Sequence, residues 1–131
     1  MTPIRSAMIS LTVAGILLTG ATAQGADLSK ELGTAITHAG LAVGSADLKL
    51  VQTHLHHVVN CLVGPGGNGF DASQANPCKD QGSGAIPDAP PDKTKVLQTA
   101  LTSAQEGLAT TNFDKAKEKA TETQAALKRA Q

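Results

Sequence analysis

The chain has 131 residues, with eleven basic and eleven acidic side chains and only two aromatic ones, Phe70 and Phe113. The balanced charge gives no reason to expect nucleic acid or an anionic membrane surface as a partner. The shortage of aromatic rings excludes a base-stacking platform and argues against a haem pocket, which is usually lined by large flat side chains.

The first residues have the pattern of an export signal rather than of a folded element. Arg5 precedes an uncharged apolar run, Ala7 to Leu18, and Ala21-Thr22-Ala23 matches a small-x-small cleavage pattern. We therefore predict a signal peptide over residues 1–23, and a periplasmic or secreted mature chain. The apolar run is too short for a comfortable membrane span, so we expect no stable membrane insertion after cleavage.

Residues 24–131 are expected to form a single domain that begins with a helical hairpin over residues 27–63. Apolar residues at helical spacing predict one helix from Asp27 to Val43 and a second from Ala46 to Val63. Gly44 is placed at the C′ position of the first helix, and Ser45 at the N-cap of the second. Such a short connection forces the two helices to lie antiparallel.

Residues 64–91 differ in composition from the segments on either side. They contain six glycines and five prolines, a density at which we expect neither helix nor strand. Cys61 and Cys78 are the two cysteines of the chain, and an oxidising compartment favours a disulfide between them. Closing that loop should stabilise the fold by about 3 kcal/mol. In the alternative, Cys61 is a free thiolate beside the histidines.

The helical pattern returns over residues 92–130, and it repeats the first hairpin. A shift of 65 residues aligns Leu32 with Leu97 and carries the apolar stripe of the second helix onto apolar or small positions. One hairpin cannot bury its own apolar face. We therefore predict an all-α fold, an antiparallel four-helix bundle made of two tandem hairpins that a long disulfide-closed loop joins.

The four histidines all lie in the first hairpin, at positions 38, 54, 56 and 57. In heptad notation His38 and His54 occupy g positions, which face each other across an antiparallel pair, and His57 lies one turn from His54. Three imidazoles near one point are a candidate copper or zinc site. The alternative is a set of solvated or hydrogen-bonded histidines without any ligand.

The repeat supplies an internal control for this cluster. The four histidine positions correspond to Ser103, Lys119, Thr121 and Glu122 in the second hairpin, so building the fold does not require histidine there. His56 points elsewhere and is only an additional candidate ligand. No acidic side chain lies beside the cluster as a general base, and the Gly-rich run after Val63 lacks a phosphate-loop ending. We therefore do not expect an enzyme.

Alanine-rich hairpins in tandem, with histidines such as Ile36-Thr37-His38-Ala39 and His54 to His57, resemble the bacterial small metal-binding proteins. That resemblance implies a periplasmic four-helix bundle that binds copper and other divalent metals. It carries over His38, His54 and His57 as ligands, and His56 less directly. Two features depart from the family: this chain has few histidines, and it has a long disulfide loop. We expect binding or buffering of a transition metal, copper first and zinc or nickel next. The alternative is a non-catalytic module that binds a periplasmic protein through the loop.

Overall fold

The computed structural model describes residues 26–131, and this part of the chain contains five helices and no strand. The helices are α1 (Leu28–Gly44), α2 (Leu48–Val63), α3 (Ala85–Asp88), α4 (Pro91–Ala109) and α5 (Phe113–Ala130). The predicted all-α class is confirmed. The predicted signal peptide lies outside the described residues. None of the helices from residue 26 onward is both long and apolar enough to cross a membrane.

The start of α2 differs from the prediction. Asp47, not Ser45, caps this helix, and its carboxylate accepts a hydrogen bond of 2.9 Å from the backbone N–H of Leu50. Gly44 is the last residue of α1 and not the residue beyond it. The Ser45 hydroxyl donates to the Leu41 carbonyl at 2.8 Å, so this side chain satisfies the end of α1 instead.

The prediction that residues 64–91 contain no helix is wrong at their end. A short helix, α3, forms over Ala85–Asp88, and α4 begins at Pro91, inside the predicted loop. The physical reason is the position of the prolines. Proline in the first turn of a helix has no intrahelical N–H bond to lose, and its fixed φ suits the helix. Pro87 and Pro91 both fall in such first turns.

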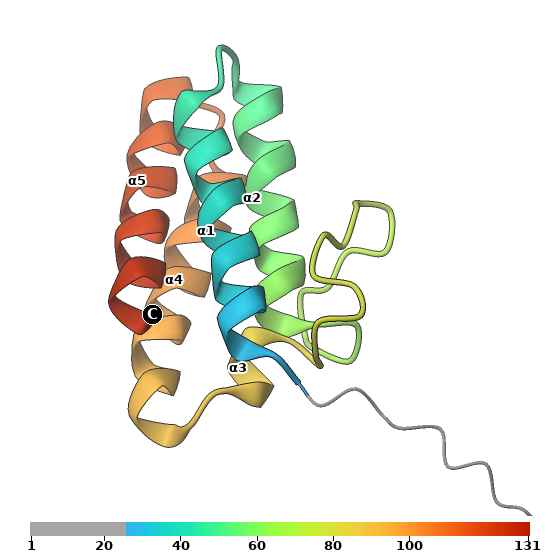
Figure 1. Ribbon diagram of the computed structural model, residues 1–131. Helices are drawn as coiled ribbons and strands as arrows, with labels where there is room; N and C mark the ends of the chain where they lie inside the picture. The colour runs from blue at the N-terminus through green and yellow to red at the C-terminus, as the bar shows by residue number, and fades with distance from the viewer. Residues whose placement is uncertain (1–25) are drawn as a thin grey trace, which may run out of the picture.

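The four long helices pack side by side around a small core. Helix α1 lies against α2 and α5, while α4 lies against α5 and α2 (Figure 1). The chain reverses direction between α1 and α2 and again between α4 and α5 (Figure 1). The core contains residues from both halves of the repeat, with equivalent positions buried in each: Leu32, Ala35, Val51, Leu55 and Leu62, then Leu97, Ala100, Ala116, Ala120 and Leu127.

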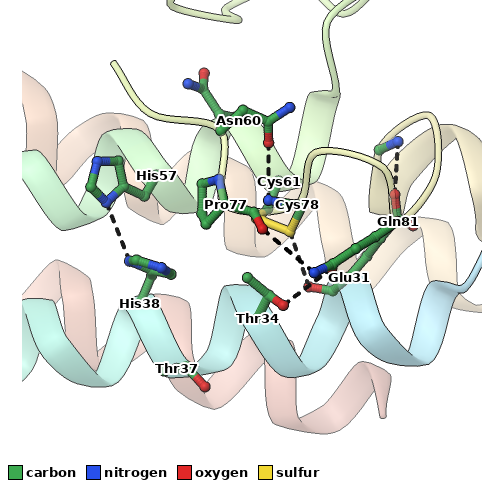
Figure 2. Close-up of a disulfide and its surroundings, with 12 residues drawn as sticks. Glu31, Thr34, Thr37, His38, His57, Asn60, Cys61, Pro77, Cys78 and Gln81 are labelled. Atoms are coloured by element: carbon green, nitrogen blue, oxygen red, sulfur yellow. Dashed lines mark hydrogen bonds between the residues drawn. A yellow bond between two sulfur atoms is a disulfide. The ribbon is translucent and has the colours of Figure 1, made fainter.

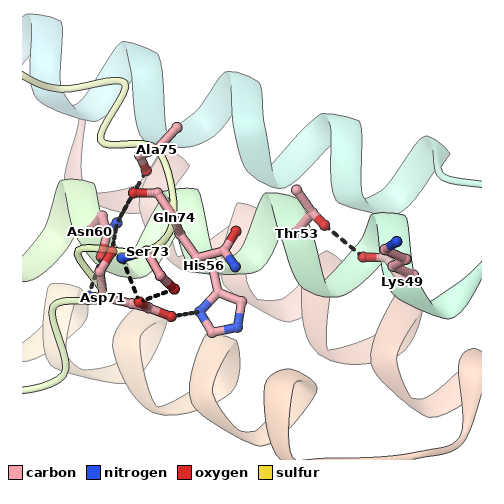
Figure 3. Close-up of polar contacts among 8 residues, drawn as sticks. All are labelled: Lys49, Thr53, His56, Asn60, Asp71, Ser73, Gln74 and Ala75. Atoms are coloured by element: carbon pink, nitrogen blue, oxygen red, sulfur yellow. Dashed lines mark hydrogen bonds and ion pairs between the residues drawn. The ribbon is translucent and has the colours of Figure 1, made fainter.

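The loop between α2 and α3 is held to the helices by a disulfide and a buried amide. Cys61 and Cys78 form the predicted disulfide, with a Cα–Cα distance of 5.1 Å. Asn60, fully buried beside it, donates to the carbonyls of Asp71 at 3.0 Å and Ala75 at 3.1 Å (Figure 3). Its Oδ1 accepts from the N–H of Asp71 at 2.9 Å. The loop therefore has a fixed path over the end of α2.

The two stems of the loop cross where only glycine fits. Gly64, with a φ of 66°, and Gly84, with a φ of 120°, both adopt backbone conformations that other residues rarely take. A Cβ on Gly64 would also collide with the carbonyl of Ser83, and one on Gly84 with the backbone of Val63. The loop thus enters and leaves the helices at one tight crossing.

Candidate metal centre

Three of the four histidines converge between α1 and α2. His38 lies in the middle of α1, and His54 and His57 lie one turn apart on α2. The Nδ1 atom of His38 is 3.4 Å from Nδ1 of His54 and 3.2 Å from Nδ1 of His57. Figure 2 shows the His38 and His57 rings facing each other across the hairpin. The predicted approach of these three side chains is confirmed.

Local structure explains why the rings meet. Residues three apart on a helix are neighbours on its surface, which places His54 and His57 on one face of α2. The connection between α1 and α2 is only three residues long, so that face lies directly against α1 at the height of His38. Fully buried Ala35, Ala39, Leu55 and Val58 hold the helices together on the core side of the cluster.

The three facing nitrogens cannot all form hydrogen bonds with one another at the same time. In a neutral imidazole an Nδ1 atom either carries the proton and donates, or carries one lone pair and accepts. Nδ1 of His38 faces two such atoms at hydrogen-bond distance. It can form a well-aligned bond with only one of them, whichever tautomer it adopts. A metal ion accepts a lone pair from every nitrogen at once, so a cation satisfies what the rings cannot.

The nitrogen separations also fit a metal ion. Two imidazole nitrogens bound to one tetrahedral ion at about 2.05 Å lie about 3.3 Å apart. The two separations that involve His38, 3.2 and 3.4 Å, match this value. One ligand nitrogen from each of the three residues lies within 4.8 Å of the others. Rotation about side-chain torsions would bring the His54 and His57 nitrogens to the same separation.

The environment favours the neutral form of two of the rings. Burial lowers the pKa of His38, and the neighbouring His57 and His54 lower it further. Burial also lowers the pKa of His57, with contributions from His54 and His56. Metal ligation requires an unprotonated nitrogen, so a lowered pKa makes the lone pairs available at neutral pH.

The remaining predicted ligands lie elsewhere. His56 points away from the cluster, and its Nδ1 lies 3.6 Å from the Asp71 carboxylate in the loop (Figure 3). Cys61 is bonded to Cys78, so it offers no thiolate, and that alternative is excluded in this structure. Among the described residues the only group of three or more candidate ligands is His38, His54 and His57. Imidazole alone is a donor set that suits copper, zinc and nickel.

Sequence reasoning missed two buried polar side chains near this region. Asn60 anchors the loop, and Glu31, in the first turn of α1, is completely buried. Asn60 directly precedes Cys61 near the end of α2. Its only signal in the sequence is that it is a polar residue within the apolar run from Val58 to Val63. An acidic residue in the first turn of a helix, such as Glu31, favours the helix dipole, and nothing in its spacing indicates burial.

Comparisons with protein-family models, with curated proteins and with solved structures found no match to this chain. The resemblance to the small metal-binding proteins therefore stays a prediction.

Proposed function

We propose that this protein binds or buffers a transition metal ion, copper first and zinc or nickel next, without catalysing a reaction on it. The observation that carries the proposal is the approach of His54 Nδ1, at 3.4 Å, and His57 Nδ1, at 3.2 Å, to Nδ1 of His38. One metal ion can accept a lone pair from all three nitrogens together. Copper comes first because imidazole sites bind Cu²⁺ more tightly than Ni²⁺ or Zn²⁺.

The proposal includes the scaffold and its location. The four long helices would act as an antiparallel four-helix bundle of the kind the small metal-binding proteins use, with the α1–α2 hairpin as the metal-binding half. The disulfide between Cys61 and Cys78 supports an oxidising compartment, the periplasm or the exterior. The predicted signal peptide over residues 1–23 is consistent with export.

Calorimetric titration of the purified chain with Cu²⁺ and with Zn²⁺ tests this function. We expect one ion per chain in the unmodified protein. Replacing both His54 and His57 by alanine should weaken binding on the order of 100-fold or more, because even outer-shell partners of a metal commonly contribute 10- to 100-fold. His56→Ala is the matched control, since this residue lies on the same helix but outside the cluster.

Two results would contradict the proposal. Equal affinity in the double variant and the unmodified chain would exclude histidine ligation at this site. A loss of affinity in His56→Ala as large as that in the double variant would show that the ion binds elsewhere on α2.

A second function, as a protein-interaction module, is favoured by a groove beside the loop. This groove, about 950 Å³ in volume, lies between the loop, α3 and α4. None of its lining residues is charged: Val63, Pro65, Gly66, Gly67, Asn68, Gly82, Ser83, Ile86, Pro87, Gln98, Leu101 and Gln105. Carboxamides beside an apolar floor suit an uncharged, extended peptide, whose backbone amides need both kinds of contact.

A photo-crosslinking residue in place of Leu101 tests this second function. We expect it to capture a periplasmic protein from living cells only while the disulfide is intact. The same residue in place of Thr121, exposed on α5, is the control. Equal capture at both positions, or capture that persists in a chain without the two cysteines, would exclude the groove as the contact surface.

A further inference from the structure

The buried carboxyl of Glu31 is only half satisfied. This residue, in the first turn of α1, has an exposed fraction of 0%. Its Oε1 accepts a hydrogen bond of 3.0 Å from the backbone N–H of Gly84, which ties α1 to the segment before α3. Its Oε2 is the one buried side-chain oxygen or nitrogen among the described residues that has no hydrogen-bond partner. An ionised carboxylate left this way would carry a large desolvation cost.

A second carboxyl group lies beside it. Asp88, the last residue of α3, accepts a hydrogen bond of 2.6 Å from the backbone N–H of Ser83. Carboxyl oxygens of Glu31 and Asp88 both approach Gly82 so closely that a Cβ there would collide with each of them. Gly82 therefore lies between two acidic side chains, one from α1 and one from α3.

Neither Glu31 nor Asp88 forms an ion pair with any basic side chain in residues 26–131. The charged groups that act on Glu31 are Asp88 and Asp27, both acidic. Asp27 is itself paired with Lys30 on the exposed side of α1. Burial is the main cause that raises the pKa of Glu31, and Asp88 raises it further.

We propose that Glu31 holds a proton while the Asp88 carboxyl group lies beside it, and that this proton latches the segment 81–88 onto α1. With the proton present, the pair carries a single negative charge and the carboxyl groups hold the Ser83 and Gly84 amides. Without it, two like charges face each other next to buried Oε2, and the segment is pushed away from α1. Gly82, Ser83, Ile86 and Pro87 form one wall of the groove, so the latch sets whether that wall is closed. The proposal does not depend on metal binding.

The direction of the pH effect follows from linkage. Because the pKa of Glu31 is raised in the closed state, the closed segment binds the proton more tightly than an open one. The latch is therefore complete at low pH and weakens as the pH rises above the ordinary glutamate value of 4.5. Opening releases one proton, so the open population should grow by up to about tenfold per pH unit until the closed-state pKa is passed.

Carboxyl ¹³C NMR of the full chain, with amide hydrogen exchange in parallel, tests the latch. We expect the Glu31 carboxyl to titrate above 4.5, and Asp88→Asn to move its midpoint to lower pH. In the unmodified chain the protection of the Ser83 and Gly84 amides, corrected for intrinsic exchange, should fall as the pH rises, by up to about tenfold per pH unit. In Glu31→Gln, which has no proton to lose, that protection should not change with pH.

Asp92→Asn, an acid in the first turn of α4, is the control and should leave both measurements unchanged. A Glu31 midpoint at or below 4.5 would overturn the proposal, as would a midpoint that Asp88→Asn does not lower. Protection that falls equally in the unmodified chain and in Glu31→Gln would also overturn it. If Glu31→Gln fails to fold, the Glu31 midpoint in Asp88→Asn decides the question.

Discussion

The two hairpins place different chemistry at equivalent positions. Where α1–α2 has His38, His54 and His57, the repeat puts Ser103, Lys119 and Glu122 in α4–α5. Those three side chains also meet: Glu122 Oε2 accepts from Lys119 Nζ at 2.8 Å and from the Ser103 hydroxyl at 3.4 Å.

The difference between the clusters lies in how they balance charge. Glu106 adds a second carboxylate 2.8 Å from Lys119, and the bonds to Glu106 and Glu122 raise the pKa of that lysine. This cluster contains its own donors, acceptors and opposite charges. The histidine cluster contains three imidazole rings and no acidic side chain, and its ring nitrogens contact only one another. The repeat therefore brings three side chains together in both halves, and only in the first half could the three hold a metal ion.

The largest expected effect comes from copying the second cluster into the first hairpin. The triple variant His38→Ser, His54→Lys and His57→Glu should lose metal affinity by at least about 100-fold, because all three ligands are gone. It should keep its helical content, since the same side chains are tolerated at these positions in α4–α5. Calorimetry and circular dichroism measure the two quantities. A triple variant that still binds Cu²⁺ like the unmodified chain would refute the comparison.

The reverse exchange should create a second site. Ser103→His, Lys119→His and Glu122→His place three imidazoles where three side chains already converge. We expect the stoichiometry of Zn²⁺ binding to rise from one ion to two per chain, as measured by calorimetry. The same variant with His38, His54 and His57 replaced should bind one ion. A stoichiometry that stays at one ion per chain would mean that three histidines at these converging positions are not sufficient to bind a metal ion.

A smaller effect is expected from removing the disulfide, which joins the first hairpin to the loop. Replacing Cys61 and Cys78 by alanine should lower the free energy of unfolding by about 3 kcal/mol, because the unfolded chain regains the entropy of the loop. Urea unfolding measures this change. Metal affinity should change little, since the three histidines lie on helices outside the loop. A large loss of affinity would show that the loop, and not the helix pair, positions the ligands.

The smallest expected effect is the pH dependence of the metal-free chain. The pKa values of His38 and His57 are lowered on folding, so the unfolded chain takes up more protons. Their contribution to stability is complete above the ordinary histidine pKa of 6.5 and is lost as the pH falls below it. The urea midpoint of the unmodified chain should therefore decrease between pH 7.5 and 5 relative to that of the triple variant. If the urea midpoints of the two proteins change equally between these pH values, the histidines do not cause the pH dependence of stability.

Helical periodicity was sufficient to predict the histidine cluster, because the spacing of His54 and His57 and the short turn before α2 fix their relation to His38. The presence of two cysteines in a chain with an export-signal pattern was sufficient to predict the Cys61–Cys78 disulfide. The positions of Glu31 and Asn60 could not be predicted, since both are buried by the path of an irregular loop that no periodic pattern encodes. The short helix α3 was missed because the prediction counted every proline as a helix-breaking residue. Pro87 lies in the first turn of α3, where proline is tolerated.

The fixed crossing at Gly64 and Gly84, together with the Asn60 contacts, has a consequence for protein engineering. These anchors hold the chain at both ends of Pro65 to Phe70, so that stretch is a short exposed excursion between fixed points. Doubling the length of such an excursion costs only about 0.6 kcal/mol in closure entropy. Foreign peptides inserted there would be displayed beyond the end of α2, on a small disulfide-bonded scaffold. His54 and His57 lie more than one helical turn before that end.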